Sequence, residues 1–419
     1  MRVLARVRIL TAALVAVAPL YPSAADSLLQ RGDRVAVVGD SITQQAKYSR
    51  FIEAYLMACT PQLELQVMQL GWSGETAAGF VRRMERDLVL WRPDVATLCY
   101  GMNDGGWRSY ADWIGKEYDG AMRAIVGRLV GLDCTVIVGA PGVVDTDTFR
   151  WQPDEVNDKL ARLGTFGEQV ATDFRMPFAD VHRQMMDAMI AAKAEYGPAY
   201  HVAGSDGVHP AQNGHLIMAC AFLRAMELDG HIGTFSLDWK GTSAASPGHE
   251  LLTWKDGRAR IRSERYPFCF EGEPADPAGT LGMTPFIPFN EELNRFMLVV
   301  TNLPVQEVDV QWGRLTQRVT AAELGEGINL AALFPENPFS RPFRNVQAAV
   351  LRKQTFETYW VHGKYRLTHF RPLQGGRPKS EDNRLERWRR MEEIQEEHRQ
   401  RVRAAVEPVV HTLVISPVE

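Results

Sequence analysis

The stretch that decides the fold is RVAVVGDSIT, residues 34–43, a β-branched apolar run that ends in a Gly-Asp-Ser turn. The apolar run predicts a buried strand, and a helical pattern begins near Gln45, so Ser41 lies where a strand passes into a helix. Ligands of open parallel sheets gather at such turns, and the helix dipole there favours developing negative charge. A serine that only caps a helix would look the same, so this turn alone predicts a site only weakly.

The same alternation of strand and helix continues to about residue 228. Further strand patterns cover residues 63–68, 94–100, 134–139 and 176–179. Helical patterns cover residues 76–90, 112–130 and 154–173, and a last helix follows Pro210. This order predicts an α/β domain with three layers, in which helices cover both faces of a parallel sheet.

The pattern changes near Gly230, and a smaller β-rich region followed by C-terminal helices is expected. Strand patterns cover residues 232–239, 250–254, 259–263, 296–302, 305–312 and 315–319, and helical patterns cover 343–358 and 377–407. The predicted domains are 1–25, 26–229, 230–374 and 375–419, the last being a charged helix and tail. Residues 267–290 are either a functional loop or a solvated linker. The charged helix is either a solvated helix or a docking element.

Residues 1–25 have the pattern of a secretory signal peptide. Arg2, Arg6 and Arg8 precede an apolar stretch, and small residues at 23–25 provide a cleavage site. The alternative is an uncleaved anchor, but the apolar stretch is shorter than the roughly 20 residues that span a bilayer. The sequence therefore predicts a secreted or periplasmic protein with no stable membrane insertion after cleavage.

Composition and charge limit the classes of function. The net charge of −4, from 47 basic and 51 acidic residues, lacks the positive excess typical of proteins that bind nucleic acid, so none is expected as a partner. The chain has five cysteines, an odd number without a Cys-x-x-Cys pair, which favours neither a zinc ribbon nor a disulfide framework. They are Cys59, Cys99, Cys134, Cys220 and Cys269.

Three more loops carry polar or glycine-rich sequence at the expected sheet edge. GWSGET, residues 71–76, follows the second strand, and GMNDGG, residues 101–106, follows the third. Backbone N–H groups of such turns and the amide of Asn103 are donors that can hold an oxyanion. DGVHP, residues 206–210, precedes the last helix, and the Asp206 carboxylate can reach one ring nitrogen of His209 while the other faces Ser41.

With these blocks in this order, residues 34–228 resemble the SGNH hydrolase superfamily, also called GDSL esterases and lipases. Ser41 matches the first block, Gly74 the second, Asn103 the third, and Asp206 with His209 the fifth. Isoleucine replaces the leucine of the family's usual first motif, and Gln69 stands where the second block more often has asparagine. The resemblance implies a flavodoxin-like α/β/α fold.

The resemblance also implies two-step acyl transfer with Ser41 as nucleophile, His209 as base and Asp206 as its orienting partner. The N–H groups of Ser41 and Gly74 and the amide of Asn103 would form the oxyanion hole. No cofactor and no metal are expected. Two further carboxylates near these turns, Asp40 and Asp104, are expected to orient the turns by accepting backbone hydrogen bonds.

The predicted function is a secreted serine esterase that removes acetyl or other short acyl groups from carbohydrate, so the substrate is a small-molecule or glycan ester. The alternatives are a lipase or lysophospholipase of the same superfamily and a non-catalytic carbohydrate-binding protein. A metal site built from His201, His215 and the two triad residues has no standard ligand spacing. Trp72, Trp107 and Trp113 are either a platform for substrate or core residues.

Overall fold

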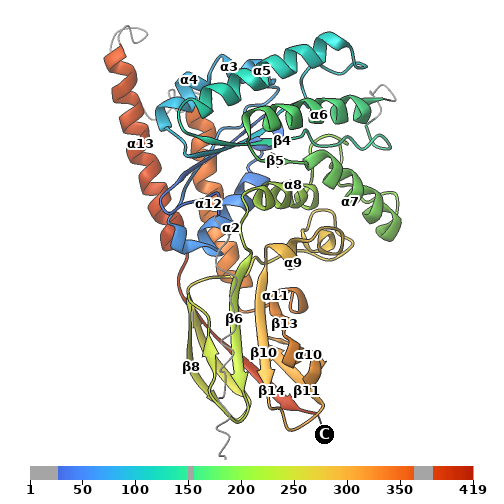
Figure 1. The fold of residues 1–419 in the computed structure, drawn as a ribbon, viewed down its shortest axis with the longest axis vertical. Helices are drawn as coiled ribbons and strands as arrows, with labels where there is room; N and C mark the ends of the chain where they lie inside the picture. Colours follow the sequence, from blue (N-terminus) through green and yellow to red (C-terminus); the bar gives the residue numbers. More distant parts are fainter. Residues whose placement is uncertain (1–26, 150–154, 363–380, 419) are drawn as a thin grey trace, which may run out of the picture.

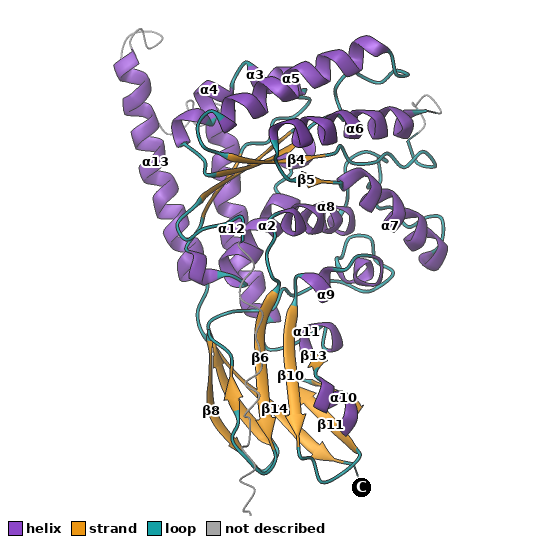
Figure 2. Ribbon diagram, viewed as in Figure 1, coloured by secondary structure: helices purple, strands orange, loops and turns teal. Residues whose placement is uncertain are grey.

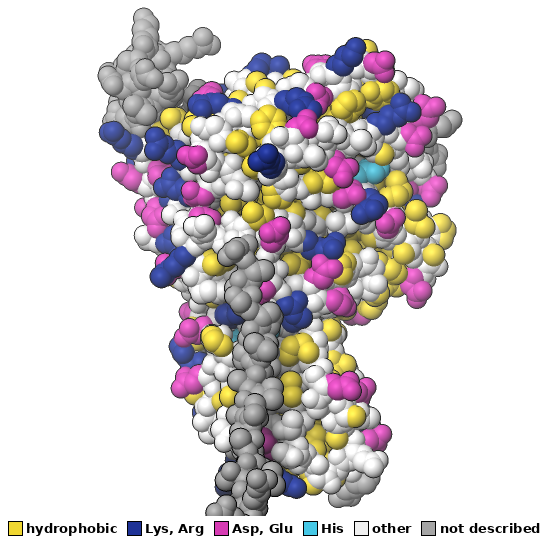
Figure 3. Space-filling model, viewed as in Figure 1, with side chains coloured by type: hydrophobic (Ala, Val, Ile, Leu, Met, Phe, Trp, Pro, Cys, Tyr) yellow, Lys and Arg dark blue, Asp and Glu magenta, His cyan; other side chains and the backbone are white. Residues whose placement is uncertain are grey.

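The computed structural model describes residues 27–149, 155–362 and 381–418, with residues 381–387 described by their backbone. The predicted signal peptide, residues 1–25, lies outside the described residues. Among those that are described, no helix is long and apolar enough to cross a membrane. The molecule is elongated, with an α/β part at one end and a β-rich part at the other (Figure 1). Basic and acidic side chains are intermixed on the face shown in Figure 3.

The predicted α/β/α domain is confirmed. Its sheet is parallel throughout, with the order β2-β1-β3-β4-β5. The strands are β1 (Arg34–Gly39), β2 (Gln66–Gln69), β3 (Val95–Cys99), β4 (Thr135–Gly139) and β5 (Phe178–Ala179). Strand β1 is buried from Val35 onward because its neighbours pair with both edges and helices cover both faces. This burial explains why β1 has a continuous apolar run and no alternation.

Alternate residues of β1 enter two separate cores. Val35 and Val37 pack with α2, α7 and α8, whereas Ala36 and Val38 pack with α3, α4, α5 and α6. The helices are α1 (Ser41–Gln44), α2 (Tyr48–Ala58), α3 (Ala77–Val81), α4 (Met84–Asp87), α5 (Asp112–Val130), α6 (Val156–Phe174), α7 (Val181–Tyr196) and α8 (Gln212–Ala225). Short 3₁₀ helices occur at η1 (Pro61–Leu63) and η2 (Val89–Trp91). The single helix predicted over residues 76–90 is therefore wrong: the chain forms α3, α4 and η2 there, and Arg82 and Arg83 lie between α3 and α4.

The β-rich part consists of two sheets that face each other (Figure 2). One has the order β13-β10-β6-β7 and the other β12-β11-β14-β9-β8. The strands are β6 (His231–Asp238), β7 (Ala244–Ala245), β8 (His249–Lys255), β9 (Arg258–Ser263), β10 (Arg295–Thr301), β11 (Glu307–Trp312), β12 (Leu315–Thr320), β13 (Ile328–Asn329) and β14 (Val409–Pro417). Their shared core is aromatic, with Phe296 stacked on Trp312 at 5.7 Å and edge-on to Phe235 at 4.9 Å.

The C-terminal region contains the predicted charged helix, but the predicted tail after it is a strand. After α10 (Ala321–Glu326) and α11 (Leu330–Leu333), the long helices α12 (Ser340–Val361) and α13 (Glu381–Ala404) run back along the α/β domain (Figure 1). The chain then returns as β14, which lies between β9 and β11. His411, Leu413 and Ile415 alternate into the core, so the last residues are an interior strand of the β-rich part.

Both ends of the segment of residues 267–290 are packed, whereas residues 271–276 are exposed, so of the two alternatives a simple solvated linker is wrong. It contains η3 (Leu281–Phe286) and leads into α9 (Phe289–Glu292). Phe268, Phe270 and Phe289 are buried and contact one another with ring centroids 4.8–5.4 Å apart. The 3₁₀ helix contacts α7 and α8. The apolar side chains of this segment therefore form part of the core that joins the α/β and β-rich parts.

Candidate active site

The carboxyl ends of β1, β2 and β3 bring the three predicted loops together. Trp72 N donates to Gly39 O at 3.0 Å, which places the second loop against the end of β1. Ser73 N donates to Gln44 Oε1 at 2.6 Å, so the same loop is also tied to α1, the helix that begins at Ser41. Asn103 Nδ2 lies 3.3 Å from Asp40 Oδ2, so the third loop lies beside the Gly-Asp-Ser turn that follows β1.

Ser41, His209 and Asp206 form one continuous path of hydrogen bonds. Ser41 Oγ lies 2.9 Å from His209 Nε2, and His209 Nδ1 lies 2.7 Å from Asp206 Oδ2. Asp206 Oδ1 accepts from the N–H groups of Val208 at 2.9 Å and His209 at 2.8 Å. Burial raises the pKa of Asp206, but these hydrogen bonds to the charged form outweigh it and hold the pKa below its usual value. The carboxylate is therefore ionised and oriented at neutral pH.

Glycine at residue 204 lets the loop that carries His209 close on itself. Gly204 has φ of +79°, and a Cβ atom there would lie 1.9 Å from His209 O. The loop is thus narrower than any side chain would permit. This tight closure brings the side chains of Asp206 and His209, which are three residues apart in the sequence, into contact.

The three candidate oxyanion donors lie at the ends of the first three strands. Gly74 has φ of +72°, which favours glycine, and it is exposed. Neither Ser41 N nor Gly74 N donates a hydrogen bond to any described residue, which leaves both N–H groups available to a ligand. Asn103 Nδ2 donates to Glu75 O at 3.1 Å, so its amide is held beside Gly74.

Two buried carboxylates orient these turns, as the sequence predicts. Asp40 Oδ1 accepts from Ile42 N at 2.9 Å, and Asp104 accepts from Ala77 N at 3.1 Å and Gly101 N at 3.0 Å. Burial raises the pKa of both Asp40 and Asp104 to about 7. Neither carboxylate bonds to Ser41 or His209 in the hydrogen bonds of the described residues.

The sequence did not reveal a buried ion pair that anchors the second loop, residues 71–76. The Arg83 guanidinium binds Glu75 through two contacts of 2.6 Å and donates to Leu70 O at 2.8 Å. Tyr100 OH donates to Glu75 Oε2 at 2.7 Å. Both charged side chains are less than one-tenth exposed. No motif marks a pair eight residues apart across a break in a helix, so only the structure identifies it.

The other histidines have separate structural partners. His215 is fully buried, accepts from Tyr48 N through Nδ1 at 3.2 Å and stacks on the Tyr48 ring. Burial holds the pKa of His215 well below its usual value, so the ring is neutral. His201 Nδ1 lies 3.3 Å from Thr148 Oγ1. No cluster of three or more potential metal ligands occurs among the described residues.

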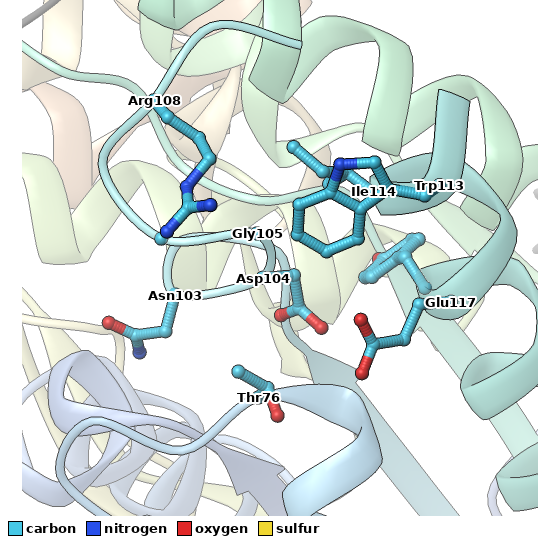
Figure 4. Close-up of a pocket in the computed structure, with 10 residues that line it drawn as sticks. Thr76, Asn103, Asp104, Gly105, Arg108, Trp113, Ile114 and Glu117 are labelled. Atoms are coloured by element: carbon cyan, nitrogen blue, oxygen red, sulfur yellow. The ribbon is translucent and has the colours of Figure 1, made fainter. Parts of the chain in front are cut away.

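A cavity of about 240 Å³ lies beside Asn103, between the third loop and α5 (Figure 4). The carboxylates of Asp104 and Glu117 face into it, and the Trp113 ring forms one wall (Figure 4). Trp113 is 48% exposed, and the Arg108 guanidinium lies 5.8 Å from the centre of its ring. The cavity therefore combines an open aromatic face with acceptors for hydroxyl groups.

The three tryptophans that the sequence placed near the site have different environments. Trp107 is 44% exposed and contacts Phe149 at 5.2 Å, so both it and Trp113 are surface residues. Trp72 is partly buried and stacks on His362 of the C-terminal region at 4.2 Å. Of the three, only Trp113 lines the cavity beside Asn103.

Comparison with known proteins gives one family and one shared fold. Residues 37–217 match the GDSL-like lipase/acylhydrolase family. An acetylxylan esterase of Geobacillus stearothermophilus is 26% identical over 215 residues, which are 46% of this chain and 93% of that esterase. A solved structure of a gut microbial diltiazem-metabolizing enzyme aligns over 93% of this chain and 98% of its own, with a TM-score of 0.71 and 20% identity. That last likeness shows that the fold, including the C-terminal region, is shared.

The family match begins in β1, includes the Gly-Asp-Ser turn and all three loops, and reaches into α8, directly after His209. The matched residues therefore contain most of the α/β domain that positions the site, and the predicted resemblance is confirmed. On this basis residues 37–217 form a domain similar to the GDSL-like lipase/acylhydrolase family, and the chain is a carboxylic ester hydrolase.

Proposed function

We propose that the chain is a serine esterase in which Ser41 is the nucleophile, His209 the general base and Asp206 the residue that orients the histidine. The single observation that carries this proposal is the hydrogen-bonded path from Ser41 Oγ through His209 to Asp206, with steps of 2.9 and 2.7 Å. Asp206 fixes the proton of His209 on Nδ1, so that Nε2 can accept the proton of Ser41.

In the first step Ser41 Oγ attacks the ester carbonyl carbon and His209 Nε2 takes the hydroxyl proton. The carbonyl oxygen becomes an oxyanion that accepts from the N–H groups of Ser41 and Gly74 and from the amide of Asn103. His209 then gives the proton to the leaving alcohol, and an acyl-enzyme remains. Water repeats the sequence on the acyl-enzyme and releases the carboxylic acid.

For the substrate we propose an acetyl or other short acyl ester of a carbohydrate. The acetylxylan esterase relative supports this class, as does the cavity beside Asn103. A sugar presents an apolar face of C–H groups to an aromatic ring and hydroxyl groups to carboxylates. Trp113 and Glu117 provide these two features within one cavity.

The test is hydrolysis of p-nitrophenyl esters from two to twelve carbons, with acetate release from acetylated xylan, by the wild type and Ser41→Ala. Ser41→Ala and His209→Ala should each lose several orders of magnitude of turnover while remaining folded, because both residues act as one unit. We expect kcat/KM to fall at least about tenfold, or 1.4 kcal/mol, from acetyl to octanoyl esters. Full activity in a folded Ser41→Ala protein would refute the mechanism, and a maximum at eight carbons or more would favour a lipase.

We also propose that residues 1–25 direct export and are then removed. The basic, apolar and small-residue regions in that order support this proposal. Mass spectrometry of the exported protein should find an amino terminus close to Asp26. A mature chain that retains Met1 would contradict it.

A further inference from the structure

The buried face of α12 is unusual because it carries a cluster of polar side chains among its apolar ones. Lys353, Gln354 and Glu357 have no exposed surface, and they meet Glu53 of α2, which is 1% exposed. Buried charges destabilise a fold unless they are paired and hydrogen-bonded. The contacts of these side chains therefore show how the buried charges are compensated.

Two carboxylates share one ammonium group in this cluster. Lys353 Nζ lies 3.0 Å from Glu53 Oε1 and 2.6 Å from Glu357 Oε1. Gln354 Nε2 donates to Glu53 Oε2 at 2.8 Å and Gln395 Nε2 of α13 donates to Glu357 Oε1 at 2.7 Å. Burial lowers the pKa of Lys353, but the two carboxylates outweigh it and raise the pKa, so the ammonium stays charged. The cluster joins α2, α12 and α13.

The second oxygen of Glu357 extends this cluster to the loop that carries Gly74. Glu357 Oε2 accepts from the backbone N–H of Gln69, the last residue of β2, at 3.0 Å. The buried side chain of Gln69 then accepts from Gly71 N at 2.8 Å and donates to Thr43 O of α1 at 3.0 Å. The loop start is thus bonded on one side to α12 and on the other to the helix that begins at Ser41.

The residue that directly follows α12 makes an independent contact with the same loop. His362 stacks on the indole of Trp72, with ring centroids 4.2 Å apart and planes at 11°. Arg83, which binds Glu75, has its guanidinium 5.3 Å from the same indole ring. Trp72 and Glu75 flank Ser73 and Gly74, so the candidate oxyanion N–H lies between two anchored residues.

We propose that Glu357 and His362 are positioning residues for the ester hydrolase: they hold the loop of residues 70–75 so that Gly74 N–H stays directed at the oxyanion. This inference rests on the proposed role of Gly74. α12 lies beyond residue 217, where the family match ends, so the C-terminal region supplies part of the active-site support. The transition state needs this donor more than the bound substrate does, so loss of the support lowers kcat more than it raises KM.

The test uses the full-length chain and four variants at the end of α12. His362→Ala removes the stacking on Trp72, and His362→Phe restores an aromatic ring. Tyr359→Ala is the matched control because Tyr359 is 47% exposed on the same turn of the helix. Glu357→Gln is nearly isosteric, yet every partner of Glu357 is a donor, so its new NH₂ group must face one of them.

We expect His362→Ala to lower kcat for p-nitrophenyl acetate about tenfold, with KM within about twofold and Tm within about 2 °C of the wild type. His362→Phe should recover kcat to within about threefold, and Tyr359→Ala should match the wild type. Glu357→Gln should lower kcat in the same way and also lower Tm, since it disturbs a buried ion pair.

The proposal is overturned if folded His362→Ala keeps kcat within twofold, if Tyr359→Ala loses as much activity, or if His362→Phe recovers none of it. Ser41→Ala, measured in the same assay, separates the two proposals. An inactive wild type, or an active Ser41→Ala, rejects the proposed function itself. An active wild type with an inactive Ser41→Ala and an unaffected His362→Ala rejects only the role of α12.

Discussion

Replacing Asp206 by asparagine tests the orientation of His209 with almost no change in shape. Asp206 Oδ1 accepts from two backbone N–H groups, at 2.9 and 2.8 Å, while Oδ2 faces His209 Nδ1 at 2.7 Å. An asparagine has one oxygen, and it must stay on the backbone donors because the opposite orientation would direct an NH₂ group at both of them. In Asp206→Asn the NH₂ group therefore faces His209 Nδ1.

A ring nitrogen that receives this NH₂ group must be the unprotonated one, so the proton of His209 moves to Nε2. Nε2 is the atom that lies 2.9 Å from Ser41 Oγ, and it can then no longer accept the serine proton. We expect kcat for p-nitrophenyl acetate to fall about 10³- to 10⁴-fold, or about 4 to 5.4 kcal/mol, with KM within about threefold. Since the Asp206 side chain is 55% exposed, water can solvate the variant and Tm should change little.

The measurement is steady-state kinetics together with the initial burst of p-nitrophenolate and a thermal unfolding curve. Asp147→Asn is the control, because Asp147 is a 73% exposed carboxylate that pairs with Lys193 and has no contact with the triad. It should retain wild-type kinetics. A folded Asp206→Asn enzyme that stays within tenfold of the wild type would refute the idea that Asp206 sets the tautomer of His209.

Three further predictions concern the oxyanion, the alcohol portion and the β-rich part. Asn103→Ala should lower kcat about 10²- to 10³-fold with a smaller change in KM, and an effect on KM alone would reassign Asn103 to substrate binding. Trp113→Ala should raise KM for acetylated xylooligosaccharides about tenfold and leave KM for p-nitrophenyl acetate unchanged. Trp107 lies outside the cavity, so Trp107→Ala should change neither KM value. Equal effects of Trp113→Ala on both substrates would contradict a sugar subsite. Burial lowers the pKa of His249 to about 4 and of His411 to about 3, whereas the ordinary pKa of a histidine is 6.5. Below pH 6.5 the unfolded chain therefore binds more protons than the folded protein. The folded protein loses stability as the pH falls from 6.5 toward 4 and 3. Histidine-labelled NMR spectra should show both rings neutral at pH 5, and a midpoint near 6.5 would contradict this.

The parts of the site that the sequence predicts are those that local pattern and parallel topology determine. Ser41 follows a strand that is apolar enough to lie in the centre of a sheet, and Asn103 follows the neighbouring strand. The carboxyl ends of parallel strands lie at one edge of the sheet, so the meeting of the loops that follow them can be predicted without knowing how the helices pack. His209 and Asp206 are three residues apart, and their contact is likewise local.

What the sequence could not predict depends on contacts between distant residues. Glu357 bonds to Gln69 across 288 positions, and nothing local to either residue indicates the partner. The helix predicted over residues 76–90 has good periodicity, but the chain is interrupted between α3 and α4, where Arg83 binds Glu75 and Leu70 O. Tertiary contacts here override local propensity.

The last strand shows why a linear division into domains is misleading for this chain. β14 lies between β9 and β11, so the β-rich part is complete only after α12 and α13 have returned to the α/β domain and left it again. The interior position of β14 fixes the end of α13, and Gln395 of α13 bonds to Glu357 of α12, which bonds to the active-site loop. The β-rich part therefore fixes the carboxyl end of α13, while α12 is held against the α/β domain by its own contacts with Glu53 and Gln69. Packed and hydrogen-bonded contacts thus run from the β-rich part to the end of β2 beside the active-site loop, although no strand of the β-rich part carries a triad residue.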